Sequence, residues 1–179
     1  MNSVWARAAT TAAVISVLAL AGCNRGDAGG AADLEANARA AAFFMESNAK
    51  ADGVQTLPSG LQYKVVQSGP SGAPSPDRND LVRVDYEGAL TDGTVFDSSF
   101  SRGQPYVTTA EQVVPGWTEA LQRMKVGDEW MLYLPPELGY GERGQGADIP
   151  PNSVLVFRIK LLDVAPVPGG GRGVGIAQG

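Results

Sequence analysis

The sequence predicts an α+β protein in which an antiparallel β-sheet packs on one short helix. From Leu57 onward, apolar and polar residues alternate with the period of two that is typical of half-buried strands. Gly- and Pro-rich turns separate these segments, and within this region only residues 116–124 show the helical spacing of apolar side chains. Because a twisted sheet needs cover for its apolar face, we expect this short helix to supply it.

Residues 1–22 have the layout of a secretory signal peptide. A short segment carrying Arg7 precedes an apolar, small-residue stretch at 8–20, which is too short and too polar to span a membrane comfortably. Cys23, the only cysteine, ends the run LAGC, which resembles the lipobox of bacterial lipoproteins. The resemblance implies cleavage before Cys23 and a lipid on its thiol. The alternative is an ordinary signal peptide or anchor helix in which Cys23 has no role.

A lipid on Cys23 would place the protein in the bacterial cell envelope, facing the periplasm. More than one acyl chain gives stable attachment, since each buried CH₂ contributes about 0.8 kcal/mol. Asn24 stands where some lipoproteins carry the Asp that retains them in the inner membrane. We therefore favour the outer membrane.

The segment between this signal and the sheet divides into two parts. Residues 23–32 are rich in Gly and Ala and are expected to form a flexible tether. Residues 33–53 are expected to hold a single helix that begins at the N-cap Asp33 and stops at Gly53. One face of this helix would carry Leu34, Ala38, Ala41, Met45 and Ala49. Because that face is mostly Ala, we expect light packing, either on the domain or on a partner.

Residues 54–165 carry the strand signals and form the expected folded domain. A last strand is expected at 154–164, and the Gly-rich residues 166–179 have no periodicity and are expected to be disordered. The apolar residues expected on the buried face of the sheet are Leu61, Tyr63 and Val65, then Val82, Val84 and Tyr86, then Trp130, Leu132 and Leu134.

The composition excludes several classes of chemistry. The chain has no histidine and one cysteine, which removes the commonest general base, the usual catalytic triads and a thiolate zinc cluster. We expect no metal and no cofactor. The net charge is −5 and there is no basic run, so nucleic acid is not an expected partner.

Short motifs occur in the order and at the separations of an FKBP domain, and the resemblance covers residues 57–164. The motifs are VDYEG at 84–88, DGTVFDSS at 92–99, VVPGW at 113–117, MKVG at 124–127, LGYG at 138–141, and IPPN at 149–152 followed by LVF at 155–157. The resemblance implies a strongly twisted antiparallel half-barrel wrapped on the short helix, and peptidyl-prolyl cis–trans isomerase activity.

The resemblance also implies a set of site residues, transferred motif by motif. Arg102 would brace Asp97 through a salt bridge, and Tyr106 stands where many members have Phe. The Tyr140 hydroxyl and the Val114 amide would fix the substrate backbone. The catalytic residues would be Tyr86, Phe96, Asp97, Trp117, Tyr140 and Phe157, and the substrate-binding residues Val113, Val114, Ile149, Arg102 and Tyr106.

Such a site needs no nucleophile, metal or proton shuttle. An X–Pro bond rotates slowly because amide resonance must be broken, a barrier of about 18–20 kcal/mol. The twisted transition state depends less on solvation by water than the planar amide does, so a dry aromatic cavity favours the transition state. The expected substrates are proline-containing, unfolded or partly folded polypeptides, and a macrolide inhibitor of the family is a possible ligand.

The run LPSGLQYK at 57–64 further resembles the bacterial branch typified by the macrophage infectivity potentiator and FkpA-like proteins. Those relatives often carry a long helical dimerisation arm. Because only residues 33–53 are available for one here, we expect a monomer or a weak dimer. Gln145, Gly146 and Asp148 depart from the flap of eukaryotic members, which makes tight macrolide binding a weaker expectation than catalysis.

Other interpretations of these residues remain open at this point. The aromatic residues would be plain core in an arbitrary sheet protein, Asp97 could cap a turn, Tyr140 could be a loop aromatic, and Arg102 an exposed charge. On the same fold, the protein could be a non-catalytic peptide-binding module or a holding chaperone. A structural envelope lipoprotein that uses the domain as a spacer is a third hypothesis.

Overall fold

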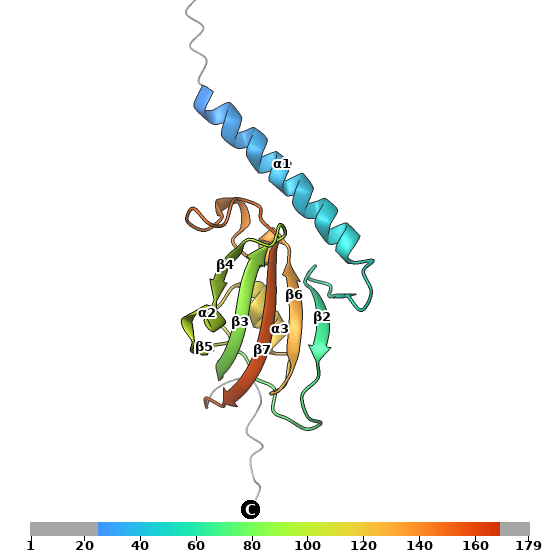
Figure 1. Cartoon of the computed structure of the whole chain (residues 1–179), viewed down its shortest axis with the longest axis vertical. Coiled ribbons are helices and arrows are strands. Elements are labelled where there is room, and N and C mark those ends of the chain that lie inside the picture. Colours follow the sequence, from blue (N-terminus) through green and yellow to red (C-terminus); the bar gives the residue numbers. More distant parts are fainter. Residues whose placement is uncertain (1–24, 169–179) are drawn as a thin grey trace, which may run out of the picture.

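The computed structural model describes residues 25–168 and places a sheet, a short helix against it and a long helix across one end (Figure 1). The helices are α1 (Arg25–Asn48), α2 (Ser99–Arg102) and α3 (Pro115–Leu121), with 3-10 turns η1 (Pro136–Leu138) and η2 (Gly141–Arg143). The strands are β1 (Gln55–Thr56), β2 (Gln62–Gln67), β3 (Leu81–Leu90), β4 (Val95–Ser98), β5 (Tyr106–Thr109), β6 (Glu129–Leu134) and β7 (Leu155–Ala165). The predicted α+β class, an antiparallel sheet on one short helix, is confirmed.

The long strand β3 organises the sheet, whose order is β1-β2-β6-β7-β3-β4 with β5 also beside β3. On one side β3 pairs antiparallel with β7 along its whole length. On the other side β5 pairs with residues 81–84 and β4 with residues 87–89. Between these two short strands the Tyr86 N–H donates instead to Ser99 Oγ of α2, at 2.9 Å. The helix α2 therefore supplies a hydrogen-bond acceptor to β3 in the gap between β4 and β5.

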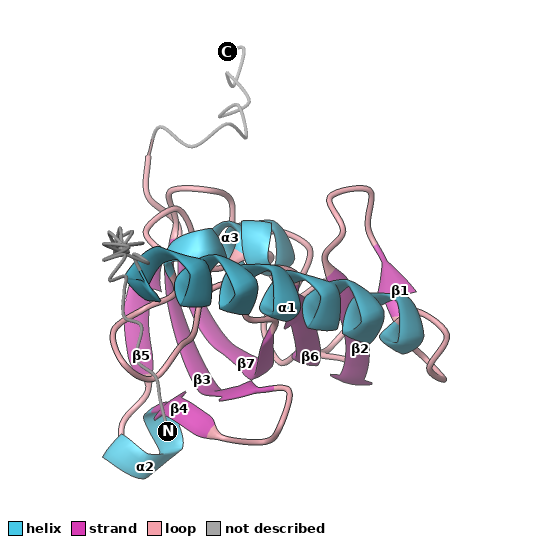
Figure 2. Ribbon diagram, turned by 90° about the horizontal axis from the view of Figure 1, so that it is seen from above, coloured by secondary structure: helices cyan, strands magenta, loops and turns pink. Residues whose placement is uncertain are grey.

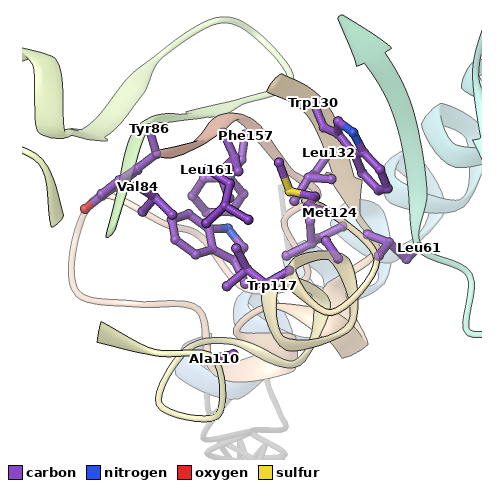
Figure 3. Close-up of a cluster of buried hydrophobic side chains, with 14 of the residues drawn as sticks. Leu61, Val84, Tyr86, Ala110, Trp117, Met124, Trp130, Leu132, Phe157 and Leu161 are labelled. Carbon is purple, nitrogen blue, oxygen red and sulfur yellow. The ribbon is translucent and has the colours of Figure 1, made fainter. Parts of the chain in front are cut away.

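The core lies between α3 and the sheet, where Trp117 packs with residues of β3, β6 and β7 (Figure 3). The alternation predicted for β3 is confirmed, because Val82, Val84 and Tyr86 are buried while their neighbours point outward. The alternation is weaker in β6, where the side chains between Trp130, Leu132 and Leu134 are also half-buried. The short helix thus covers the apolar face as expected.

The long helix α1 begins earlier than expected. It is helical from Arg25, so the predicted tether at 23–32 is wrong over its described part, and Asp33 lies inside the helix instead of capping it. The prediction weighted the glycines, whereas the alanines that alternate with them have the highest helix propensity of all residues. Seen from above, α1 lies across one end of the sheet (Figure 2).

The buried face of α1 is also different from the predicted Ala stripe. Ala38 and Ala49 are exposed. The face that meets the domain carries Leu34, Asn37, Ala41, Phe44, Met45 and Asn48, with the Phe44 ring 6.2 Å from that of Tyr133 on β6. The single helix thus packs on its own domain, and polar residues share the contact.

This contact explains a second correction, in β2. Gln62 was expected on the exposed face, but it is buried, and Val65 is exposed. The Gln62 side chain donates to the Met45 carbonyl at 2.8 Å and accepts from Asn48 Nδ2 at 2.8 Å. Because α1 covers this part of the sheet, the polar side chain is satisfied there by the helix.

The predicted signal peptide, Cys23 and the predicted tail from residue 169 onward lie outside the described residues. Within residues 25–168, none of the helices combines the length and the apolar character that crossing a bilayer requires.

Gly116 in α3 should tolerate no side chain, because a Cβ there would lie 2.5 Å from Leu134 Cγ. We expect Gly116→Ala to lower the free energy of unfolding by about 1–3 kcal/mol through overpacking, in spite of the better helix propensity of Ala. Urea denaturation of the full-length protein in detergent would measure it. Adding Leu134→Val should recover part of the loss, and wild-type stability of Gly116→Ala alone would contradict this packing.

Candidate active site

A cavity of about 410 Å³ opens at one end of the core, between α3 and the sheet. This volume is within the range of small-molecule and peptide side-chain pockets. The lining residues come from β3, β4, β5, α3, β7 and the loops before α3 and after η1. They are Tyr86, Phe96, Asp97, Tyr106, Gln112, Val113, Val114, Trp117, Tyr140 and Phe157. The structure therefore brings together all of the predicted site residues of the domain except Arg102 and Ile149.

The aromatic residues of the cavity form a continuous chain of edge-to-face contacts. Tyr86 meets Trp117 with ring centroids 5.0 Å apart and planes at 83°, and Trp117 meets Phe157 at 5.1 Å and 82°. Tyr106 extends the chain beyond Tyr86, at 5.8 Å, and Phe96 extends it beyond Phe157, at 5.6 Å. Figure 3 shows Trp117 between Tyr86 and Phe157, which project from β3 and β7. Each ring is thus held by its neighbour.

Gly88 on β3 allows the rings at one end of this chain to close. A Cβ on Gly88 would lie 2.6 Å from Phe157 Cε1 and 2.7 Å from Phe96 Cε2. Any side chain at this position would therefore displace both rings. The close packing of these two rings explains why the VDYEG motif has a glycine at this position, which the sequence pattern alone did not reveal.

Asp97 is held at the cavity wall by two partners. The Tyr86 hydroxyl donates to Asp97 Oδ2, and Arg102 donates to Asp97 Oδ1. Arg102 also donates to the Tyr86 hydroxyl oxygen at 2.9 Å, and its guanidinium lies 5.4 Å from the Tyr86 ring centroid. Arg102 is thus not an isolated surface charge. It stands behind Asp97, which explains why it does not line the cavity.

These contacts set the ionisation of the group. Burial raises the pKa of Tyr86 to about 12, with the hydrogen bond to Asp97 adding to the effect. Burial acts to raise the pKa of Asp97 as well, but the hydrogen bonds from Tyr86 and Arg102 outweigh it and hold that pKa below its ordinary value. At neutral pH the site therefore holds an ionised carboxylate and a neutral phenol.

The short helix α2 determines where Asp97 points. Its N-cap is Ser98, whose side chain accepts from the Ser101 N–H, and its C-cap is Gly103 in the left-handed conformation. The alternative role of Asp97 as a turn cap is thus taken by Ser98. Ser99 bonds to the β3 backbone, so Asp97 is left at the end of β4 with its carboxylate on the pocket side.

The unengaged hydrogen-bonding groups at the cavity within residues 25–168 include the buried Trp117 Nε1 and the two groups that were expected to fix the substrate backbone. The Val114 N–H and the Tyr140 hydroxyl have no hydrogen-bond partner there. Burial, with the nearby charge of Asp97 second, raises the pKa of Tyr140, so its hydroxyl is a neutral donor at physiological pH. Both groups are available to a bound peptide.

Ile149 was expected to bind substrate, but it belongs to the buried core and does not line the cavity. The backbone of Ile149 forms an isolated antiparallel bridge with Gln145, and this bridge folds the loop back on itself. In the folded-back loop, the Ile149 side chain is buried in the core instead of facing the cavity. Gln112, by contrast, lines the cavity and was not predicted. Its position directly before the VVPGW motif was the available signal. Within residues 25–168 there is no cluster of His, Cys, Asp and Glu that could hold a metal ion.

Comparisons with known proteins agree with this geometry. The family model for the FKBP-type peptidyl-prolyl cis-trans isomerase matches residues 72–162, and a model for the domain amino terminal to it matches residues 18–65. The chain belongs to the FKBP-type peptidyl-prolyl cis–trans isomerase family, which confirms the resemblance drawn from the motifs.

Individual relatives extend the match. The FKBP-type 22 kDa peptidyl-prolyl cis-trans isomerase of Escherichia coli strain K12 is 52% identical over 121 residues, which are 68% of this chain and 58% of that protein. Outer membrane protein MIP of Legionella longbeachae is 47% identical over 68% of this chain and 51% of its own length. The crystal structure of FkpA from E. coli superposes with a TM-score of 0.74 at 43% identity, covering 79% of this chain and 65% of that one. The chain thus spans a little over half the length of these two curated relatives.

Acid should weaken the fold through Asp97. The pKa of Asp97 is depressed in the folded state, so on acidification the unfolded chain binds the proton first. The contribution of Asp97 to stability is therefore complete when the pH is above the ordinary pKa of 3.8. It is lost as the pH falls through the folded-state pKa. We expect the difference in unfolding free energy between wild type and Asp97→Asn to be constant from pH 7 to about pH 5 and to shrink below that. Urea titrations at each pH would measure it, and a difference that did not change with pH would contradict the assignment.

Proposed function

We propose that the protein is a peptidyl-prolyl cis–trans isomerase that accelerates X–Pro isomerisation in exported polypeptides. The observation that carries this proposal is the open cavity of about 410 Å³ walled by interlocked aromatic rings. Uncatalysed isomerisation takes tens to hundreds of seconds, which is slow enough to limit folding. An apolar cavity lowers this barrier because the twisted amide loses less by leaving water than the planar amide does.

Each group at the cavity has a role in this scheme. Trp117, with Tyr86, Phe96 and Phe157 around it, seats the pyrrolidine ring. The Val114 N–H and the Tyr140 hydroxyl bind the carbonyl groups on either side of the proline, which fixes the peptide while the bond turns. The Asp97 carboxylate faces the carbon side of the twisted carbonyl. Its ionisation at neutral pH, maintained by Arg102 and Tyr86, suits an interaction with a polarised carbon atom.

The proposed place of action is the periplasmic side of the bacterial envelope. The LAGC run favours a lipid on Cys23, and the similarity to a relative that is named an outer membrane protein supports the same compartment. The polypeptides that pass through it are unfolded, and their X–Pro bonds populate the cis isomer more often than in folded proteins. Substrates of this class match the cavity. A monomer or weak dimer is the proposed assembly.

Removal of the Tyr140 hydroxyl should slow catalysis without unfolding the protein. We expect Tyr140→Phe to lower kcat/KM for a short X–Pro peptide by about threefold to tenfold, the effect of one hydrogen bond formed in the transition state. The matched control is Tyr63→Phe, which removes a hydroxyl bonded to Gln55 Oε1 at 2.9 Å, away from the cavity, and should stay within about twofold of wild type.

The same assay decides between enzyme and binding module. Equal rates for wild type and for a Tyr140→Phe and Asp97→Val double variant would remove the catalytic proposal. Suppressed aggregation of an unfolded client, without faster isomerisation in the wild type, would identify a holding chaperone on this fold.

Lipid attachment at Cys23 has a separate test. In a bacterial expression host, the wild type should incorporate labelled palmitate and sediment with membranes, and Cys23→Ser should do neither because it lacks the thiol. Asn24→Asp should keep the label and move the protein toward the inner membrane if the expected sorting applies. Equal labelling of wild type and Cys23→Ser would exclude this anchor.

A further inference from the structure

The loop that carries Tyr140 is tied to the N-terminal helix by a reciprocal pair of asparagine contacts. Asn37 Nδ2 on α1 donates to the Pro151 carbonyl at 2.9 Å. In return, Asn152 Nδ2 donates to the Leu34 carbonyl of α1 at 3.0 Å. Both Leu34 and Asn37 lie near the middle of α1. Two segments more than 100 residues apart are thus joined by side chains that each reach the other's backbone.

Asn152 is also connected to the cavity through a backbone hydrogen bond. The Asn152 N–H donates to the Gly141 carbonyl at 2.8 Å, and Gly141 is the residue next to Tyr140. Asn152 is the one non-glycine residue of the described chain with a positive φ, 56°. Asparagine adopts this conformation more readily than most residues, and here it presents its amide N–H to Gly141 and its side chain to α1.

Apart from these contacts, the loop is anchored to the core chiefly by the buried side chain of Ile149. Between η1 and β7 its regular structure consists of η2 and the single bridge between Gln145 and Ile149. Segments of this kind open locally at low cost, and a displacement of a positioned group by about 1 Å can lower a rate by orders of magnitude. Ile149 lies well away from Tyr140 along the loop, whereas Asn152 bonds to the residue next to Tyr140, so the contacts of Asn152 contribute to the position of the Tyr140 hydroxyl.

We propose that Asn37 and Asn152 are positioning residues for the isomerase reaction: they fasten the loop between η1 and β7 to α1 and so hold Tyr140 at the cavity. This inference rests on the proposed function, because Tyr140 matters only if the cavity binds a prolyl peptide. It gives the helix α1, which contributes no residue to the cavity, a part in catalysis.

Three variants test the proposal in the full-length protein. Asn37→Ala removes one bond, and Asn37→Asp keeps the shape while replacing the donor with an acceptor opposite the Pro151 carbonyl. Asn152→Gly removes the other bond and keeps the positive φ without strain. The matched control is Asn48→Ala, which breaks a bond of α1 to Gln62 at 2.8 Å, at the C-terminal end of the helix.

We expect the three variants to lower kcat/KM for a short X–Pro peptide by about threefold to tenfold, and Asn48→Ala to leave it within about twofold of wild type. Amide hydrogen exchange without substrate should be several times faster at Asn152 in Asn37→Ala and unchanged there in Asn48→Ala. Urea unfolding measures global stability, so that a general loss is recognised by a matching loss in the control.

Equal effects of Asn37→Ala and Asn48→Ala on rate and on exchange would overturn the proposal, as would a wild-type rate and wild-type exchange in all three variants. If the wild type itself proves inactive, the proposed function fails. Faster exchange at Asn152 in Asn37→Ala would then still show that α1 holds the loop, and unchanged exchange would refute that part as well.

Discussion

The edge-to-face chain from Tyr106 through Tyr86, Trp117 and Phe157 to Phe96 is the constraint on which the rest of the site depends. Each such contact contributes about 0.5–1.5 kcal/mol beyond the area it buries. The chain crosses from β5 to β3, α3, β7 and β4, so it joins the short helix to the half of the sheet that β7, β3, β4 and β5 form. A cavity with apolar walls would collapse if its rings could rotate inward, and neighbours at right angles prevent that.

An apolar hollow open to solvent has a free-energy cost, and the polar groups around it limit that cost. The Tyr86 hydroxyl is satisfied by Asp97, and Asp97 by Arg102, so the polar edge of the wall is bonded within itself. Within residues 25–168, the Val114 N–H, the Tyr140 hydroxyl and the buried Trp117 Nε1 are left without a partner. The bonded groups thus support the wall, and the unengaged donors are free to bind.

The parts of this structure that depend on local pattern could be predicted from the sequence, and those that depend on distant contacts could not. Alternation in β3 and the helical spacing around Trp117 indicated the sheet and its cover, and ordered motifs indicated the cavity residues. The burial of Gln62 could not be predicted, because it requires α1 to lie on β2. The place of Ile149 depends on how its loop folds back, and alternation gives no information about such loops.

The packing of α1 shows why a helix with a weak apolar face can still be placed accurately. Of its apolar residues only Ala41 is fully buried, and Leu34, Phe44 and Met45 are half-buried, so burial alone would let the helix slide or turn at modest cost. Amide hydrogen bonds are directional, and those of Asn37 and Asn48 lie at separate points along the helix. Two such points fix the helix along its length, and the packing of Ala41 and Phe44 between them sets its rotation. The polar residues that weaken the amphipathic signal of this segment are therefore the ones that fix its position.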